Sequence, residues 1–150
     1  MKEQSLRRRT AAHRCDVEQP GRKGMLIIIS GPSGTGKGTL CERLLAQDKQ
    51  IVFSVSATTR QMRENETDGV HYRFISDEEF DRLIQDNAML EYACVHGHRY
   101  GTPRQPVEDA LEKGFDVLLD VDSQGAINVM RQMENCVSIF ILPPSFASLH

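Results

Sequence analysis

A glycine-rich segment in the first third of the chain has the residue types and the spacing that bind phosphate groups. Residues 31–39 read Gly-Pro-Ser-Gly-Thr-Gly-Lys-Gly-Thr, directly after the apolar run 25–29 and directly before the helix-like run 40–45. In a strand, loop and helix of this kind, backbone N–H groups face phosphate oxygens and the helix N-terminus adds partial positive charge. The lysine of the pattern reaches the β and γ phosphates. The segment therefore predicts a P-loop that binds a nucleoside triphosphate. The residues assigned to it are Gly31, Pro32, Ser33, Gly34, Thr35, Gly36, Lys37, Gly38 and Thr39.

One position departs from the usual P-loop pattern. Gly38 follows the lysine where Ser or Thr ordinarily offers a hydroxyl to Mg²⁺, and Thr39 comes one residue later. Mg²⁺ often keeps several waters and binds through substrate phosphates, so we expect phosphates and water to hold most of its coordination sphere. The run 115–122 is an apolar strand that ends in acids, which predicts that the Asp120 carboxylate lies near that metal.

The elements that must position these residues alternate between strands and helices. A serine at residue 76, followed by three acids, forms a capping box for a helix over 77–86. Residues 58–70 are polar and predict a functional or a solvated loop. Helical periodicity predicts further helices over 102–113 and from Ser123 onward, the latter capped by Ser123 and carrying Ala126, Ile127, Met130 and Met133. Apolar, β-branched runs predict strands over 25–29, 51–56, 90–98, 115–122 and 137–142, the last of them buried. This alternation favours an α/β fold with a doubly wound parallel sheet.

Length and composition restrict the classes of protein that fit. The chain has 150 residues, 39% of them hydrophobic and 26% charged, which is typical of one globular domain. The apolar runs are too short to cross a bilayer, so we expect no membrane partner. Four cysteines lie far apart without a Cys-x-x-Cys pair, which is typical of reduced thiols in a cytoplasmic protein.

The N-terminal segment differs in charge from the rest of the chain. Residues 1–24 hold seven Lys and Arg against three Asp and Glu, whereas the remainder is acidic. The simplest interpretation is a basic, disordered tail that nucleotide binding does not need. A transit peptide or an arm that touches nucleic acid is the alternative, and three acids within the segment argue against it, so we expect no nucleic-acid partner. Met25 opens the first strand and is an alternative start of the protein.

A metal site is a second interpretation of one predicted strand. Cys94, His96 and His98 alternate along the run 90–98, which places them on one face if the whole run is a single strand. No fourth ligand follows from the sequence, so we favour an ordinary strand over a zinc site.

Several longer motifs occur together downstream of the P-loop. These are residues 56–63 (Ser-Ala-Thr-Thr-Arg-Gln-Met-Arg), 69–74 (Gly-Val-His-Tyr-Arg-Phe), 90–92 (Leu-Glu-Tyr), 100–102 (Tyr-Gly-Thr) and 119–125 (Leu-Asp-Val-Asp-Ser-Gln-Gly). From Met25 onward the chain closely resembles the guanylate kinases, which transfer the γ-phosphoryl group of ATP to GMP. The resemblance implies a P-loop NTPase-type fold with an inserted small α+β subdomain that binds GMP.

The resemblance also implies a role for each matching residue. Arg60, Arg63, Tyr72 and Tyr100 would surround the GMP phosphate, and Lys37, Arg60, Arg63 and Mg²⁺ would neutralise charge during in-line transfer. Glu91 would accept the paired N–H donors of guanine, and adenine lacks that donor pair, so AMP would be rejected. Ser56 and Thr102 would add hydroxyls near the base. Asp122 would close that side, with Asp120 nearby. The substrates implied are ATP with GMP or dGMP.

The resemblance finally implies a layout. Residues 25–55 and 105–150 would form the core of the domain, and residues 56–104 the GMP-binding subdomain. Guanylate kinases continue beyond a point equivalent to residue 150 with an arginine-bearing lid, further helix and a final strand, so we expect these elements to be missing here. An alternative is therefore a catalytically incomplete guanylate-kinase-like fragment that only binds nucleotides or a partner. Adenylate kinase is a further alternative, suggested by Lys37-Gly38-Thr39, and the segment 56–100 argues against it.

Overall fold

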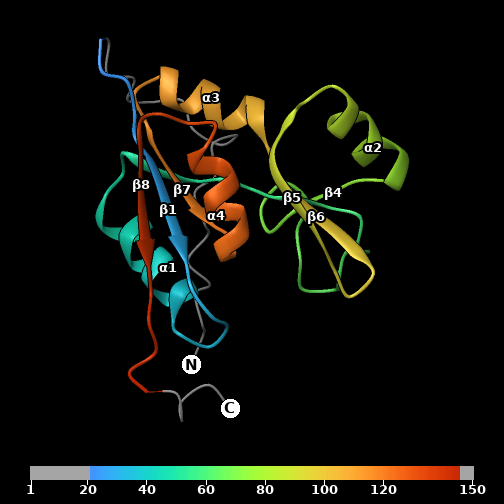
Figure 1. Cartoon of the computed structure of the whole chain (residues 1–150), viewed down its shortest axis with the longest axis horizontal. Helices are drawn as coiled ribbons and strands as arrows, with labels where there is room; N and C mark the ends of the chain where they lie inside the picture. Colours follow the sequence, from blue (N-terminus) through green and yellow to red (C-terminus); the bar gives the residue numbers. More distant parts are fainter. Residues whose placement is uncertain (1–20, 146–150) are drawn as a thin grey trace.

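Two β-sheets organise residues 21–145, the part of the chain that this computed structural model describes (Figure 1). The first sheet has the strand order β2-β7-β1-β8, and the second has the order β4-β3-β6-β5. The strands are β1 (Leu26–Ser30), β2 (Ile51–Phe53), β3 (Ala57–Thr58), β4 (Arg73–Phe74), β5 (Met89–Val95), β6 (His98–Pro103), β7 (Asp116–Asp120) and β8 (Cys136–Phe140). The helices are α1 (Lys37–Gln47), α2 (Asp77–Gln85), α3 (Arg104–Glu112) and α4 (Ser123–Met130).

The first sheet is parallel throughout and is covered by helices on both faces. β1 pairs with β7 and β8, and β2 pairs with β7, all in parallel register. Side chains alternate between the faces of a strand, so Leu26 and Ile28 pack with residues of α3 and α4. Ile29 instead packs in the cluster that holds Cys41 and Leu45 of α1. This arrangement confirms the predicted doubly wound α/β fold.

The second sheet is inserted between β2 and α3 and is mixed. β3 pairs in parallel with β4 and antiparallel with β6, and β5 and β6 form an antiparallel hairpin. α2 packs on one face through Phe80, which is fully buried and clusters with Ala57 and Met89. The Ser76 hydroxyl accepts the Glu79 N–H at 3.1 Å, so the predicted N-terminus of this helix is confirmed. The insertion forms the predicted small α+β unit beside the parallel sheet (Figure 1).

The single strand predicted over residues 90–98 is wrong, because a turn divides it. β5 ends at Val95, and His96 and Gly97 both adopt positive φ, 51° and 78°. Two adjacent residues with positive φ suit a tight hairpin turn, whose twist matches that of the flanking strands. Cys94 then lies opposite Arg99 and Val95 opposite His98, so Cys94 and His98 point to opposite faces. The shared face that the zinc interpretation required is therefore not formed.

The C-terminal strand was predicted to be buried, and it is largely exposed. β8 pairs with β1 along one edge, and no other described strand pairs with it. Val137 is 43% exposed, Ile139 41% and Phe140 50%. Two apolar residues of α4, Ile127 and Met130, are also exposed, whereas Val129 is fully buried.

Two further boundaries differ from the sequence predictions. The run 51–56 was predicted as one strand, but β2 ends at Phe53 in the first sheet and residues 54–56 lead to β3, which begins at Ala57 in the second. Ser123 was predicted to cap α4, but Asp122 is the N-cap, and its Oδ1 accepts the Gly125 N–H at 2.7 Å. A carboxylate accepts a helix N-terminal amide more strongly than a hydroxyl because it carries the complementary charge.

The predictions for residues 1–24 fall mostly outside the described residues. Within the described part, Arg22 pairs with Asp116 at 2.9 Å and donates to the Gly114 carbonyl at 2.9 Å. The Met25 N–H also donates to Asp116, at 2.8 Å. Residues 22–25 are therefore bonded to the amino end of β7.

Candidate functional site

The P-loop lies at the carboxyl end of β1, where the parallel strands end (Figure 1). Gly31 has φ 147°, and a Cβ at this position would lie 2.5 Å from the Ile141 carbonyl oxygen, so only glycine fits. α1 begins at Lys37, its N-cap is Gly36 with φ 84°, and no side chain caps it. Its first N–H groups are thus left for an external anion.

Lys37 and Asp120 add one charge of each sign to this edge of the sheet. The Lys37 ammonium donates to the Gly31 carbonyl at 2.7 Å and to the Pro32 carbonyl at 3.2 Å, so it lies within the loop. Asp120, at the end of β7, pairs in register with Ile29, two residues before the loop begins. A cation and a carboxylate next to a ring of amides can hold a polyphosphate together with a divalent metal.

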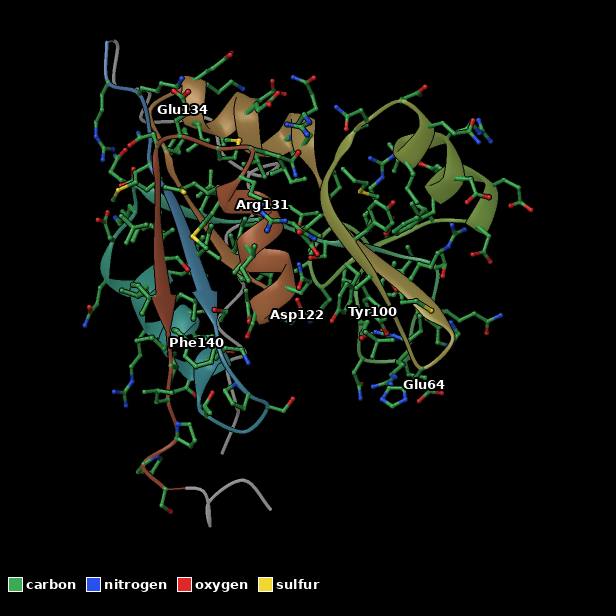
Figure 2. All side chains as sticks on the ribbon, in the orientation of Figure 1. Glu64, Tyr100, Asp122, Arg131, Glu134 and Phe140 are labelled. Atoms are coloured by element: carbon green, nitrogen blue, oxygen red, sulfur yellow. The ribbon has the colours of Figure 1, made fainter. Side chains whose placement is uncertain are left out.

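One face of the second sheet gathers most of the residues predicted to bind a monophosphate. Register places Thr58 opposite Tyr100 and Glu91 opposite Thr102, and residues directly opposite share a face. Glu91, Tyr100 and Thr102 therefore lie on one face, away from α2. Figure 2 shows Tyr100 on this sheet and Asp122 at the start of α4, between the two sheets.

Two carboxylates come close together where the two sheets meet. Thr102, which is fully buried, donates its hydroxyl to Glu91 Oε1 at 2.6 Å. A Cβ on Gly125 would lie 3.0 Å from Glu91 Oε2 and 3.1 Å from Asp122 Oδ1, so a larger residue here would crowd both carboxylates. Burial raises the pKa of Glu91 above its ordinary value, and the nearby Asp122 charge raises it further, against the lowering effect of the Thr102 hydrogen bond. The pair can accept a ligand that presents adjacent N–H donors.

An arginine and two tyrosines form the second group on this face. The Tyr72 and Tyr100 rings are 5.8 Å apart, and the Arg60 guanidinium lies 5.3 Å from the Tyr72 ring centroid. Glu66 accepts two hydrogen bonds from Arg60, at 2.7 and 2.9 Å. These bonds raise the pKa of Arg60 and lower that of Glu66 to about 2, so both groups are charged at neutral pH.

Arg63 and Ser56 are joined to this group through their main chains. The Arg63 N–H donates to Glu66 Oε2 at 2.9 Å, and the Arg63 side chain is exposed. The Ser56 carbonyl accepts the Arg73 N–H at 2.9 Å, next to Tyr72. The structure thus brings together Arg60, Tyr72 and Tyr100, and separately Glu91, Thr102 and Asp122. Among residues 21–145 the Arg63 guanidinium makes no hydrogen bond to Arg60, Tyr72, Tyr100, Glu91, Thr102 or Asp122, although its charge helps to lower the pKa of Glu66.

Sequence reasoning missed two ion-pairing residues of the second sheet and its loop. Glu66 was treated only as part of a polar loop, yet it neutralises Arg60. Arg99, which precedes Tyr100, makes ion pairs to α2. The positions of Arg60 and Glu66, six residues apart in one polar loop, hinted at the first pair. No sequence signal indicated the second, because it depends on how α2 packs.

The described residues contain no group of three or more His, Cys, Asp and Glu side chains that could hold a metal ion by themselves. No helix within residues 21–145 has the combination of length and apolar character needed to cross a membrane.

Comparison with known proteins gives one consistent family. A family model described as guanylate kinase matches residues 23–150. A guanylate kinase of Caldanaerobacter subterraneus is 52% identical over 128 residues, which cover 85% of this chain and 62% of the relative. One of a Jannaschia species is 53% identical over 130 residues, covering 85% and 60%. The crystal structure of guanylate kinase from Anaplasma phagocytophilum superposes with a TM-score of 0.71 at 43% identity, covering 85% of this chain and 65% of that one. The chain thus spans about three fifths of the length of the curated relatives that it matches.

Proposed function

We propose, from the premise that this chain belongs to the guanylate kinase family, that the protein transfers the γ-phosphoryl group of ATP to GMP or dGMP. The observation that supports this most directly is the pair of carboxylates, Glu91 and Asp122, that both lie next to Gly125. Guanine presents its N1–H and exocyclic N2–H side by side, and a carboxylate accepts both. Adenine has an acceptor where guanine has N1–H, so the same carboxylate would face a lone pair and disfavour AMP.

The donor half of the proposal rests on the P-loop. Residues 31–39 would surround the ATP phosphates, with amides from the start of α1 and the ammonium of Lys37 supplying positive charge. Lys37 would exchange its bonds to the loop carbonyls for bonds to phosphate oxygens, which carry more negative charge.

The residues beside the P-loop fit a magnesium ion that is held mainly by its nucleotide. Asp120 supplies one carboxylate beside the loop, and Thr39 supplies a hydroxyl one position later than usual. Mg²⁺ prefers oxygen ligands and tolerates several waters, so this sparse protein contribution suffices when phosphates complete the sphere. When bound, the ion neutralises phosphate charge that develops during transfer.

The acceptor half of the proposal assigns the GMP phosphate to the second group of side chains. Arg60, Arg63, Tyr72 and Tyr100 would hold that phosphate, with Ser56 and Thr102 near the base. Glu66 would remain bonded to Arg60 and fix the orientation of its guanidinium, leaving the other N–H groups for the phosphate. The attacking phosphate oxygen is already anionic, so the reaction needs positioning and charge neutralisation more than a general base.

The test is ADP formation from MgATP with purified protein and GMP, with AMP and UMP as alternative acceptors. Equilibrium binding of GMP and AMP to the same protein is measured in parallel by calorimetry. We expect GMP to bind more tightly than AMP and to be the acceptor that supports ADP formation. Equal binding of AMP and GMP would contradict the role of Glu91, and turnover with AMP alone would replace the proposed function by adenylate kinase activity.

A further inference from the structure

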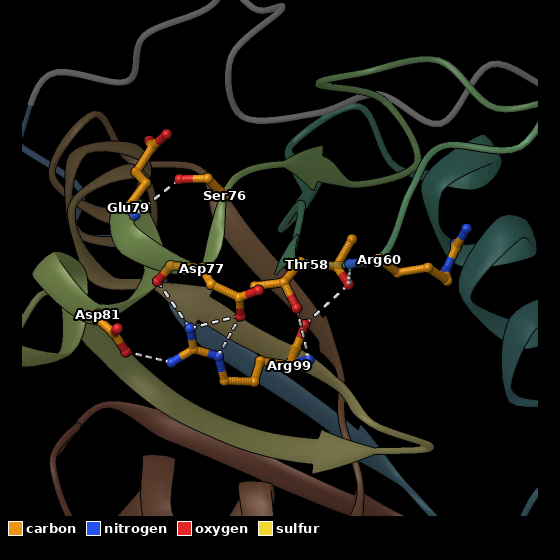
Figure 3. Close-up of polar contacts among 8 residues, drawn as sticks. Thr58, Arg60, Ser76, Asp77, Glu79, Asp81 and Arg99 are labelled. Carbon is orange, nitrogen blue, oxygen red and sulfur yellow. Dashed lines mark hydrogen bonds and ion pairs between the residues drawn. The ribbon is translucent and has the colours of Figure 1, made fainter.

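Arg99 connects the second sheet to α2 through a set of contacts on the face opposite the proposed nucleotide site. Its Nη2 donates to Asp77 Oδ1 at 2.8 Å and to the Asp77 carbonyl at 2.8 Å, and its Nη1 donates to Asp81 Oδ1 at 2.5 Å. The guanidinium also lies 4.7 Å from the centroid of the buried Phe80 ring. Figure 3 shows these bonds converging on one side chain.

The main chain of Arg99 is bonded to the segment that leads into Arg60. Thr59 donates its N–H to the Arg99 carbonyl at 3.0 Å, and the Arg99 N–H donates to the Thr59 hydroxyl at 3.0 Å. The buried Thr58 hydroxyl donates to the same carbonyl at 2.9 Å and accepts the Arg60 N–H at 3.2 Å. The two residues that precede Arg60, Thr58 and Thr59, are therefore both hydrogen-bonded to the main chain of Arg99.

Alternation along β6 sends Arg99 and Tyr100 to opposite faces of the sheet. Arg99 points toward α2, and Tyr100 points toward Tyr72 and Arg60. Figure 3 likewise shows the guanidinium groups of Arg99 and Arg60 extending away from each other. Among residues 21–145, the Arg99 side chain bonds to Asp77 and Asp81 and not to Arg60, Tyr72 or Tyr100. Its main chain, however, is hydrogen-bonded to Thr58 and Thr59 before Arg60 and leads directly into Tyr100.

We propose that Arg99 is a positioning residue for the acceptor-phosphate site, because its bonds to Asp77 and Asp81 fix the backbone that presents Arg60 and Tyr100. The identity of the acceptor, GMP, rests on the proposed function. The physical reason is that Arg60 lies in a loop without regular secondary structure, so bonds from neighbouring elements must fix its position. Small displacements of such groups are costly, since binding a phosphate requires several donors at once.

The inference predicts a selective loss of GMP binding. We expect Arg99→Ala to weaken GMP binding roughly tenfold to a hundredfold and to leave ATP binding unchanged. Arg99→Lys keeps the charge but lacks the planar group that reaches both aspartates, so its GMP affinity should lie between those of Arg99→Ala and the unsubstituted protein. The double variant Asp77→Asn, Asp81→Ala should weaken GMP binding as Arg99→Ala does, although Arg99 is still present.

The experiment measures GMP and ATP affinities by calorimetry for these variants of the full chain, with Arg82→Ala as the matched control. Arg82 is an exposed arginine of α2, the helix that carries Asp77 and Asp81, and its side chain bonds to no described residue, so the control should bind both nucleotides normally. Hydrogen exchange of the amides in residues 57–66 is measured on the same proteins without nucleotide. Arg99→Ala should speed exchange there and leave β1 and β7 unchanged.

Several results would overturn the positioning role of Arg99. Normal GMP affinity in Arg99→Ala, or an equal loss of ATP affinity, would overturn it. So would normal GMP affinity in the aspartate double variant, because Arg99 would then act other than through α2. If the unsubstituted protein binds no GMP, the proposed function fails. Hydrogen exchange then decides the positioning role alone, since unchanged exchange at 57–66 in Arg99→Ala overturns it and faster exchange there supports it.

Discussion

The parallel sheet presents its P-loop from a strand whose Leu26, Ile28 and Ile29 are fully buried, whereas the second sheet presents Arg60 from a loop held by ion pairs and hydrogen bonds. The first site is made largely of backbone amides at a strand end and a helix start, which the packing of the core fixes. The second is made of side chains, and each needs its own partner.

This difference separates two ways of keeping a binding site in place. Substitutions other than to proline leave backbone amides in place. The P-loop should therefore be sensitive to changes of its lysine and its glycines and insensitive to most changes of surface side chains. The second site depends on individual pairs of interacting side chains. A single substitution there should therefore change the affinity for one ligand or the stability of one sheet.

The largest effect should come from Phe80→Ala. Phe80 is a fully buried large side chain under the second sheet, and removing such a ring costs about 3–5 kcal/mol. If the sheets are separate, hydrogen exchange should increase in β3, β5 and β6 before it increases in β1 and β7. Leu118→Ala, in the core between the parallel sheet and α1, should give the reverse order. An equal increase in both sheets would show that they unfold as one unit and would break the comparison.

Lys37→Ala should lower the rate of ADP formation by roughly 10²–10³-fold, since it removes one fixed donor to the transferring group. GMP affinity should not change, because the ammonium bonds within the P-loop and not to the second sheet. Melting of the variant, followed by circular dichroism, checks that the fold is retained. A matching loss of GMP affinity would mean that the two sites are coupled.

Glu91→Gln should have opposite effects on binding and on stability. Loss of the carboxylate should weaken GMP binding roughly tenfold to a hundredfold, because a charge-assisted pair of hydrogen bonds is lost. Burial raises the pKa of Glu91 in the folded protein, so its ionisation destabilises the fold above that pKa. The variant without nucleotide should therefore melt at a higher temperature than the unsubstituted protein at pH 7.

The sign of that pH dependence follows from the direction of the shift. A carboxyl group whose pKa is raised by folding contributes stability below its unfolded pKa and loses that contribution as the pH rises through the folded pKa. The difference in melting temperature between Glu91→Gln and the unsubstituted protein should hence shrink as the pH falls through the raised folded pKa of Glu91 toward its ordinary value of 4.5. If this difference in melting temperature did not depend on pH, it would arise from a change in packing and not from the ionisation of Glu91.

The smallest effect on folding should come from Ile139→Lys on β8. Ile139 is 41% exposed on a strand that pairs on one side among residues 21–145, and exposed apolar edge strands promote association. The substitution should change the free energy of unfolding by no more than about 0.5 kcal/mol. Sedimentation velocity at increasing protein concentration should show less association than for the unsubstituted protein. Val52→Lys, at a fully buried site of the same sheet, should instead prevent folding.

Much of the parallel sheet could be predicted from the sequence because its signals are local. The strand before Gly31, the loop and the helix from Lys37 follow from adjacent residues, as does the Ser76 cap of α2. The predictions were wrong where the bounds or the burial of a short strand depend on the strands that lie beside it. The His96-Gly97 turn was missed because a period of two continues across it, and the exposure of β8 depends on which strands lie beside it.

The sequence by itself determined the P-loop, the alternation of strands and helices, and the family, because glycine spacing, apolar periodicity and contiguous motifs are properties of neighbouring residues. The tertiary structure alone decided which distant polar groups meet. Thr102 lies 11 residues from Glu91 in the sequence, and Arg99 lies 22 and 18 residues from Asp77 and Asp81. Sheet register and helix packing bring these groups into contact, since they fix the face on which each side chain lies and the element that it meets.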